Sequence, residues 1–479
     1  MGPLADETRW MDATGQAALV EAGEVTAQEL VDAAIERIEA LDGPINAVVV
    51  RWFEHAREIA QGALPDGPFR GVPFLLKDLW ASYAGQPLTN GNAALRAAMP
   101  ISEEDTELVS RFRRSGLVTL GRTNSPELGS LPVTEPVAYG PTRNPWALDR
   151  TPGGSSGGAA AAVAAGMVPI AHASDGGGSI RIPASCCGLV GLKPSQGRIT
   201  AGPRRSETGL GVELCVSRSV RDTARLLDAV HGPGTGDSVI APSPLRPYVD
   251  EVGADPGRLR VGFLDHHPRN GGLHPDCADA VRDTARLLES LGHVVEPGFP
   301  APLADPMFTR RFMSMWGAMM ALGIEGYGES LGRALTEDEI EPVNWAQARF
   351  ADRVSSTDYA RSLAAVAEFR RAVQQWWADG FDLLLTPTLA EPPVRIGEHD
   401  PSPEEPMRGM RRAAEFVPFT PPFNASGQPA INVPLHWNAD GLPIGVQLVA
   451  AYGREDVLIR VASQLESAAP WAWRVPAGG

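Results

Sequence analysis

Residues 175–184 read Asp-Gly-Gly-Gly-Ser-Ile-Arg-Ile-Pro-Ala, and this stretch decides the fold predicted for the chain. The apolar run before it, at 168–173, predicts a strand, and the glycines that follow predict a turn. Three consecutive glycines before Ser179 leave backbone N–H groups unobstructed, so these groups can converge on a developing oxyanion. A tight turn that merely needs glycine is the simpler interpretation. Three in a row exceed that need, and the stretch therefore indicates a serine nucleophile.

A second glycine-serine segment lies upstream at 153–158 and reads Gly-Gly-Ser-Ser-Gly-Gly. A flexible linker has this composition, but this segment stands between Pro152 and an alanine run at 159–166 that predicts a helix. A phosphate-binding loop would need a Gly-Lys-Ser/Thr ending, which is absent. Neither interpretation fits the segment well, so its glycines and serines need another explanation.

Outward from these segments, predicted strands alternate with predicted helices, which is typical of an α/β fold. The N-terminal part, 1–60, is predicted to be mainly helical, and the apolar run at 45–50 fits a short strand or a buried loop equally well. Further strands are predicted at 71–76, 118–121, 259–264, 382–386, 429–434 and 445–449, and further helices at 105–116, 218–231, 276–291 and 454–468.

The base that a serine nucleophile needs is predicted to be a lysine. None of the nine histidines lies in a recognisable motif, and His172, on a predicted strand, is expected to be a core residue. Only two of the 42 basic residues are lysines, Lys77 and Lys193. Arginine stays protonated, whereas a buried lysine can become neutral and act as a base. The sequence therefore leaves two lysines to consider as the base, and Lys77 is expected at the end of a predicted strand.

These motifs resemble those of the amidase signature family. The similarity runs through most of the chain, and its motifs are the two glycine-serine segments and the stretches at 71–78, 121–124, 143–146, 187–194, 424–430 and 441–447. The resemblance implies one α/β/α domain over 1–479, built around a large, mixed, mostly parallel twisted sheet. Its parts would be N-terminal helices at 1–60, a signature core at 68–210, and a helical insertion rich in Met and Trp at 305–380 that lines the pocket.

The resemblance also implies a catalytic role for each candidate residue. Ser179 would attack a carbonyl group, Ser155 would follow a cis peptide bond and bridge Ser179 to Lys77, and neutral Lys77 would accept the proton. The backbone N–H groups of Gly176, Gly177, Gly178 and Ser179 would form an oxyanion hole. Asp175 and Arg181 are expected to pair as ions within the nucleophile loop, and Ser156 to form a hydrogen bond within its own loop.

Other residues are given binding or structural roles. Asn124, Trp316 and Met320 are candidate substrate-binding residues, and the stretch 313–320 could form an adaptable pocket wall or ordinary helix core. Gly176 departs from the family pattern, where a larger residue is common, so the pocket could be roomier. Lys193, Cys186 and Cys187 are expected to be buried structural residues. The Pro-rich stretch at 390–412 is predicted to be a polar loop and a candidate lid.

The predicted activity is hydrolysis of small uncharged amides through an acyl-enzyme. Within the family, the segment at 421–455 and the general layout are most similar to hydrolases of 6-aminohexanoate cyclic dimers, which points to linear or cyclic amides of that type. Alternatives are a urethanase acting on carbamates, an aryl acylamidase or esterase, and a glutamine amidotransferase subunit of a larger complex. No cofactor is expected, and no cluster of metal ligands is visible in the sequence.

Composition and charge limit the partners. A net charge of −16 argues against nucleic acid or an anionic membrane surface, because both require a basic footprint. No apolar run approaches ~18 residues, so no membrane span is expected. Four cysteines without a CxxC spacing favour a reducing cytoplasm. The expected binding partner is a small amide substrate, and the sequence leaves open whether the chain forms a homodimer.

Overall fold

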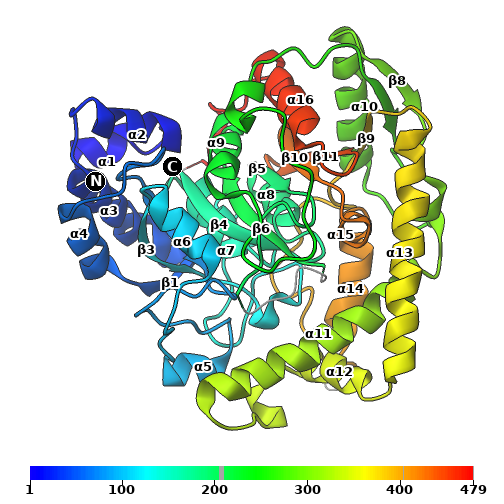
Figure 1. Cartoon of the computed structure of the whole chain (residues 1–479), viewed down its shortest axis with the longest axis horizontal. Coiled ribbons are helices and arrows are strands. Elements are labelled where there is room, and N and C mark those ends of the chain that lie inside the picture. Colours follow the sequence, from blue (N-terminus) through cyan, green and yellow to red (C-terminus); the bar gives the residue numbers. More distant parts are fainter. Residues whose placement is uncertain (204–209, 403, 478–479) are drawn as a thin grey trace.

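One mixed sheet runs through the molecule (Figure 1). The computed structural model describes residues 1–203, 210–402 and 404–477, together with the side chains in these ranges except those of residues 309 and 311–313. Residues 204–209 of the predicted signature core and residue 403 of the predicted loop therefore lie outside the described residues. In spatial order the strands are β1 (Val48–Arg51), β3 (Val118–Thr123), β2 (Pro73–Lys77), β4 (Ile170–Asp175), β6 (Val212–Ser217), β5 (Val190–Lys193), β10 (Ala430–Trp437), β11 (Pro443–Ala450), β9 (Leu383–Pro387), β7 (Arg260–Phe263) and β8 (Val294–Pro297).

The α/β class and the mixed sheet are confirmed, but the prediction of a mostly parallel sheet is wrong. Among the described strands, only β2 with β3, β2 with β4, β7 with β8 and β7 with β9 pair in parallel. All neighbouring pairs from β4 to β9 are antiparallel. The reason is that β5 and β6, and likewise β10 and β11, follow each other without a described helix between them, and strands joined in this way pair antiparallel.

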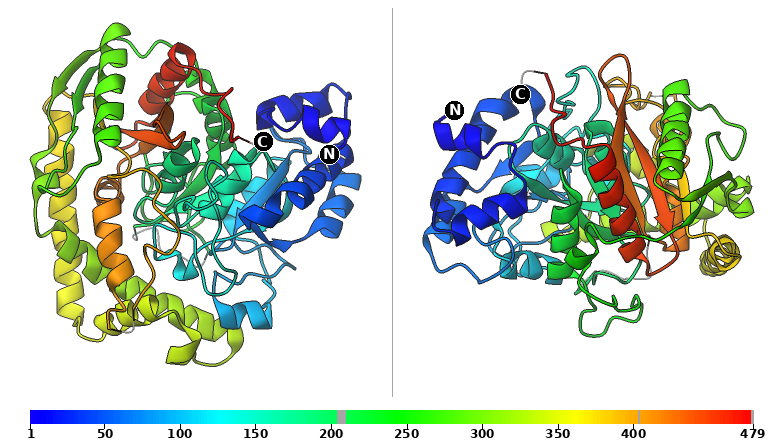
Figure 2. Two further views of the ribbon diagram at one scale, coloured as in Figure 1. Left: turned by 180° about the vertical axis from the view of Figure 1, so that it is seen from behind. Right: turned by 90° about the horizontal axis from the view of Figure 1, so that it is seen from above.

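Helices cover the sheet (Figure 2), and most lie within a few residues of the predicted positions. The N-terminal helices are confirmed, as is the strand interpretation of the run at 45–50, which forms β1. The α-helices are α1 (Pro3–Glu7), α2 (Ala13–Glu21), α3 (Ala27–Ile45), α4 (Phe53–Gln61), α5 (Ala93–Ala98), α6 (Glu107–Arg114), α7 (Gly157–Ala164), α8 (Arg181–Cys187), α9 (Val220–Val230), α10 (Pro275–Ser290), α11 (Phe308–Leu331), α12 (Pro342–Ala351), α13 (Ser356–Ala378), α14 (Arg408–Phe416), α15 (Pro421–Ser426) and α16 (Glu455–Ala468). Short 3-10 helices are η1 (Glu127–Gly129), η2 (Tyr248–Glu251), η3 (Ala301–Ala304) and η4 (Glu337–Glu339).

Around β9, β10 and β11 the two faces of the sheet contact different hydrophobic cores. Successive side chains of a strand point to opposite faces, and along β9 Leu383 and Leu385 belong to the main core whereas Leu384 belongs to a second one. Trp316 of α11 and Val373 of α13 also belong to the second core. Helices α11, α12 and α13 thus form the predicted helical insertion, which runs along the lower and right-hand edges of the molecule in Figure 1.

The polar stretch at 390–412 is only partly a loop. Helix α14 begins at Arg408, so the last five residues of the predicted loop are helical. Arg412 on this helix forms ion pairs with Glu391 and Glu398, at 2.7 and 3.2 Å, and these contacts hold the loop against α14. A lid function for this segment stays a prediction. None of the helices in the described part of the chain combines the length and apolarity needed to cross a bilayer.

Two carboxyl groups, that of the buried Glu127 and that of the half-buried Glu341, join the helical insertion to the rest of the molecule. The Oε2 atom of Glu127 in η1 accepts hydrogen bonds from the backbone N–H of Glu341 at 2.9 Å and from Asn344 Nδ2 at 2.7 Å. Glu341 Oε1 in turn accepts from the N–H of Val137 at 2.8 Å. Burial and the charge of Glu127 raise the pKa of Glu341 to about 8. Glu127 therefore holds the N-terminus of α12, and the carboxyl group of Glu341, just before this helix, retains its proton near neutral pH.

The raised pKa of Glu341 predicts that stability falls as pH rises. Between pH 4.5, the usual pKa of a glutamate, and pH 8 the folded chain holds a proton that the unfolded chain has released. The unfolding free energy therefore declines across this window, by about 1.4 kcal/mol for each pKa unit at most, and levels off above it. Denaturant titrations from pH 5 to pH 9 should show a shallower decline for Glu341→Gln than for the wild type.

Glu339 supplies the matched control for that measurement. It lies two residues earlier, and Arg333 lowers the pKa of its carboxyl to about 2, so it stays ionised throughout the range measured. Glu339→Gln should shift the stability curve evenly without changing its slope. A Glu341→Gln slope equal to that of the wild type would contradict the prediction.

Candidate active site

Lys77, Ser155 and Ser179 lie in one region of the structure. Lys77 is the last residue of β2, and Ser179 follows the end of β4, which is the parallel neighbour of β2. The carboxyl ends of parallel strands meet at the same edge of a sheet, which brings the two residues to that edge. Lys77 Nζ donates to Ser155 Oγ at 2.6 Å, and the side chains of Lys77 and Ser155 are buried. Ser179 is 8% exposed, so it is the most accessible of the three.

The loop that carries Ser155 is fixed against the loop that carries Ser179. The Gly154–Ser155 peptide bond is cis, as the family resemblance implies. The backbone N–H of Ser156 donates to the carbonyl oxygen of Ser179 at 3.3 Å. The two glycine-serine segments, which the sequence separates, are therefore in direct contact.

Ser156 binds a neighbouring strand rather than its own loop, which corrects the sequence prediction. Its Oγ donates to the carbonyl oxygen of Ser174 at 3.2 Å and accepts from the N–H of Ser174, also at 3.2 Å. Ser174, near the end of β4, also accepts a hydrogen bond from Lys77 Nζ at 2.9 Å through its Oγ. Sequence reasoning missed Ser174, although its place at a strand end just before Asp175 was a usable signal.

Asp175 and Arg181 form the ion pair that was predicted, and both are fully buried. Arg181 Nε donates to one carboxylate oxygen at 2.9 Å, and Nη2 donates to the other at 3.0 Å. Burial alone would raise the pKa of Asp175, but the charges of Arg181 and Lys193 and a hydrogen bond from Asn424 hold it at about 2. The nucleophile loop thus stays clamped by a permanent ion pair.

The comparison with known proteins identifies the family. The family model described as Amidase matches residues 29–459. The chain belongs to the amidase signature family. It is therefore a hydrolase that acts on carbon–nitrogen bonds.

Relatives and solved structures match the chain over nearly its whole length. The 6-aminohexanoate-cyclic-dimer hydrolase of Paenarthrobacter ureafaciens is 44% identical over 98% of this chain and 96% of its own. A solved structure of 6-aminohexanoate cyclic dimer hydrolase superposes with a TM-score of 0.95, at 44% identity, over 98% of this chain and 99% of that chain. A bacterial aryl acylamidase structure gives a TM-score of 0.85 at 28% identity, with 97% of each chain covered.

The oxyanion prediction needs one correction. The N–H of Gly178 donates to Asp175 Oδ1 at 2.7 Å, so it is already used and cannot also bind an oxyanion. Over the described ranges 1–203, 210–402 and 404–477, the N–H groups of Gly176, Gly177 and Ser179 show no hydrogen bond. These three groups stay candidates, since the sequence could show that glycines were present but not which N–H groups the loop uses internally.

Residues near the C-terminus hold the nucleophile loop, and sequence reasoning gave them no role. Arg181 Nη1 donates to Gln447 Oε1 at 2.6 Å, and Arg181 Nη2 donates to Asn424 Oδ1 at 2.7 Å. Asn424 Nδ2 donates to both the carbonyl oxygen and Oδ1 of Asp175, each at 2.9 Å. Asn424 and Gln447 lie in stretches that carry the family resemblance, and this was the available signal.

Two of the candidate substrate-binding residues have structural roles instead. Asn124 is fully buried, and its Nδ2 donates to Gly140 O and Thr142 Oγ1, both at 3.0 Å, which leaves its amide occupied. Met320 is 1% exposed and belongs to the second core, so its side chain is not open to a ligand in this structure. Amide and thioether side chains are common in binding pockets, but here the surrounding residues enclose both side chains.

Trp316 is the candidate that lies against the nucleophile loop. A Cβ atom placed on Gly176 would lie 3.5 Å from Trp316 Cζ3, which is ordinary van der Waals contact. The indole ring therefore packs beside the nucleophile loop at a distance that would also accommodate an alanine at position 176. Substrate binding by Trp316 stays a prediction.

Two further residues that the sequence assigned to the core have that role. His172 is fully buried, and its Nδ1 accepts from the backbone N–H of Lys77 at 3.3 Å. Lys193 is buried, and its Nζ donates to Pro194 O at 2.8 Å. Burial and the charge of Arg181 lower the pKa of Lys193 to about 7. Neither side chain replaces Lys77 as the base beside Ser155.

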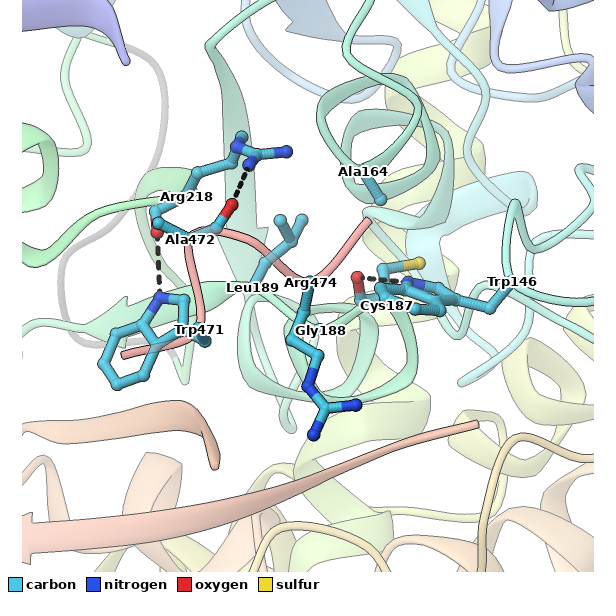
Figure 3. A pocket seen from close by; sticks show the side chains of 9 residues that line it. All are labelled: Trp146, Ala164, Cys187, Gly188, Leu189, Arg218, Trp471, Ala472 and Arg474. Carbon is cyan, nitrogen blue, oxygen red and sulfur yellow. Dashed lines mark hydrogen bonds between the residues drawn. The ribbon is translucent and has the colours of Figure 1, made fainter. Parts of the chain in front are cut away.

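The four cysteines are buried, and one pocket lies at the opposite end of α8 from Ser179. Cys186, Cys187, Cys215 and Cys277 are all buried free thiols, and burial raises the pKa of the Cys186 thiol, which disfavours the reactive thiolate. Figure 3 shows a pocket at the C-terminal end of α8, whereas Ser179 precedes the N-terminal end of that helix. None of the predicted site residues lines it; the lining residues are Trp146, Ala164, Cys187, Gly188, Leu189, Arg218, Trp471, Ala472 and Arg474.

Proposed function

We propose that this amidase hydrolyses small uncharged amides of the linear or cyclic 6-aminohexanoate type through an acyl-enzyme on Ser179. The observation that carries the mechanism is the 2.6 Å hydrogen bond between Lys77 Nζ and Ser155 Oγ, on a loop that contacts Ser179. The relative that is 44% identical and named a 6-aminohexanoate-cyclic-dimer hydrolase supports the substrate class.

In the proposed reaction, Lys77 is the base and Ser155 the proton relay. Burial of Lys77 disfavours its ammonium form, so the amine can accept a proton. As the Ser179 oxygen attacks the amide carbon, its proton passes to Ser155, and the proton of Ser155 passes to Lys77. The same route then returns a proton to the leaving amine, which breaks the carbon–nitrogen bond. A water molecule releases the acid by the same steps.

The negative oxygen of the intermediate would be stabilised by backbone N–H groups of the nucleophile loop. Gly176, Gly177 and Ser179 supply the candidate donors, since that of Gly178 binds Asp175. Fixed donors of this kind typically lower a barrier by about 3 kcal/mol each. The Asp175–Arg181 pair holds the loop in place, and Trp316 beside Gly176 would form one wall of the acyl pocket.

A substrate panel tests the proposal. The purified full chain is given 6-aminohexanoate cyclic dimer, the linear dimer, an anilide, an aryl carbamate and glutamine, and kcat/KM is measured for each. The proposal expects one of the aminohexanoate dimers to have the highest value. A higher value for the anilide would favour an aryl acylamidase, in line with that structural relative. A preference for the carbamate or for glutamine would overturn the assigned substrate class in favour of a urethanase or an amidotransferase.

A further inference from the structure

The peptide unit between Gly177 and Gly178 is held at both of its polar ends. Its carbonyl oxygen, on Gly177, accepts a hydrogen bond from Thr420 Oγ1 at 2.7 Å. Its N–H, on Gly178, donates to Asp175 Oδ1 at 2.7 Å. A peptide unit is planar, so two hydrogen bonds on opposite sides fix the rotation of the whole unit.

Thr420 is well placed to supply one of these hydrogen bonds. It is fully buried and immediately precedes α15, and its own carbonyl oxygen accepts from Arg181 Nη1 at 3.0 Å. Arg181 also pairs with Asp175. Thr420 and Asp175, which hold the two ends of the peptide unit, are thus linked to each other through one guanidinium group.

The close approach of Thr420 also explains the glycine at position 178. A Cβ atom there would lie 2.3 Å from Thr420 Oγ1, and Gly178 has a φ of +133°. Side-chain-bearing residues rarely adopt this conformation. The loop therefore has room for the threonine hydroxyl only because residue 178 lacks a side chain.

We infer that Thr420 is a positioning residue for the oxyanion-binding backbone. The unit it fixes lies between the peptide units that present the N–H groups of Gly177 and Ser179. With the hydroxyl in place, the Gly177 carbonyl oxygen points to Thr420 and away from the developing negative charge. Without it, the unit is free to rotate and disturbs the donors on either side. This inference rests on the proposed acyl-enzyme mechanism, and it assigns no contact between Thr420 and the substrate.

The test compares Thr420→Val, which removes the hydroxyl and keeps the shape, with Thr420→Ser, which keeps the hydroxyl. Loss of one oxyanion donor costs about 10²–10³ in kcat, and an indirect effect should be smaller. We expect Thr420→Val to lower kcat by about 10–100-fold with KM changed by less than about threefold. We expect Thr420→Ser to retain kcat within about threefold of the wild type.

The second-order rate of labelling by a fluorophosphonate is measured on the same variants. This rate depends on the same donors but not on the amide chosen, and it should fall with kcat. If the wild type hydrolyses no amide, the proposed function fails, and the labelling rates still test Thr420.

Thr284→Val is the matched control, because Thr284 is fully buried and its Oγ1 also donates to a backbone carbonyl, that of Ala280 at 2.8 Å in α10. It should leave both rates unchanged.

Two results would overturn the inference. One is wild-type kcat and labelling in Thr420→Val. The other is an equal loss in Thr420→Ser and Thr420→Val, which would show that packing of the γ-methyl group, not the hydroxyl, is what matters.

Discussion

Replacement of Ser179 by alanine is expected to abolish covalent labelling by a fluorophosphonate and to lower kcat/KM by at least about 10⁴-fold. The hydroxyl is the only group on this side chain that can form the acyl-enzyme. The alanine variant keeps the backbone N–H groups and the buried Asp175–Arg181 pair, so it should remain folded. Intact-mass spectrometry after labelling and the thermal midpoint check both expectations.

Ser185→Ala is the control for the nucleophile variant. Ser185 lies on α8, it is 2% exposed, and its Oγ accepts from the N–H of Gly445 at 3.0 Å. Its loss therefore removes a buried serine of the same region without touching the proposed chemistry. We expect stoichiometric labelling of Ser185→Ala. Labelling of Ser179→Ala at the wild-type rate would refute the assignment of the nucleophile.

The second large effect is expected for Lys77→Arg, with kcat/KM lowered by about 10³–10⁴-fold, the upper part of the range for a general base. Arginine keeps hydrogen-bond donors at this position, but it stays protonated and therefore cannot act as a base. The variant should therefore bind substrate and still fail to accept a proton from Ser155. For the wild type, kcat/KM should rise with pH along a basic-going limb, since only the neutral amine acts.

Lys193→Met serves as the comparison, because Lys193 is the other lysine of the chain and is also buried. Its Nζ binds only the Pro194 carbonyl among the described groups, so kcat/KM should stay within about tenfold of the wild type. Activity of Lys77→Arg within tenfold of the wild type at any pH, or a flat wild-type profile from neutral to basic pH, would remove Lys77 from its role.

Features that depend on local sequence could be predicted well. The apolar run at 71–76 predicts the strand that delivers Lys77, and β2 ends at that residue. The glycines after residue 175 predict the turn that carries Ser179. The predicted Asp175–Arg181 pair is also confirmed. Each of these follows from periodicity, turn chemistry or charge within a few residues, which one segment contains in full.

Features that depend on distant partners were predicted poorly. Asn124 was expected to bind substrate, yet Gly140 and Thr142 occupy its amide. The N–H of Gly178 was expected to face an oxyanion, yet it binds Asp175. A sequence shows which groups can form hydrogen bonds, but the packing of the folded chain decides which partner each of them meets.

The sequence by itself determined the chemical groups and their local setting: a serine after a glycine turn, a second serine in a glycine loop, and a rare lysine at a strand end. Only the tertiary structure decided how those groups are held. Thr420 and Gly177 are 243 residues apart in the chain and meet at 2.7 Å. The physical reason is that backbone conformation is largely a local property, whereas a hydrogen bond between groups far apart in the chain depends on how whole elements pack together.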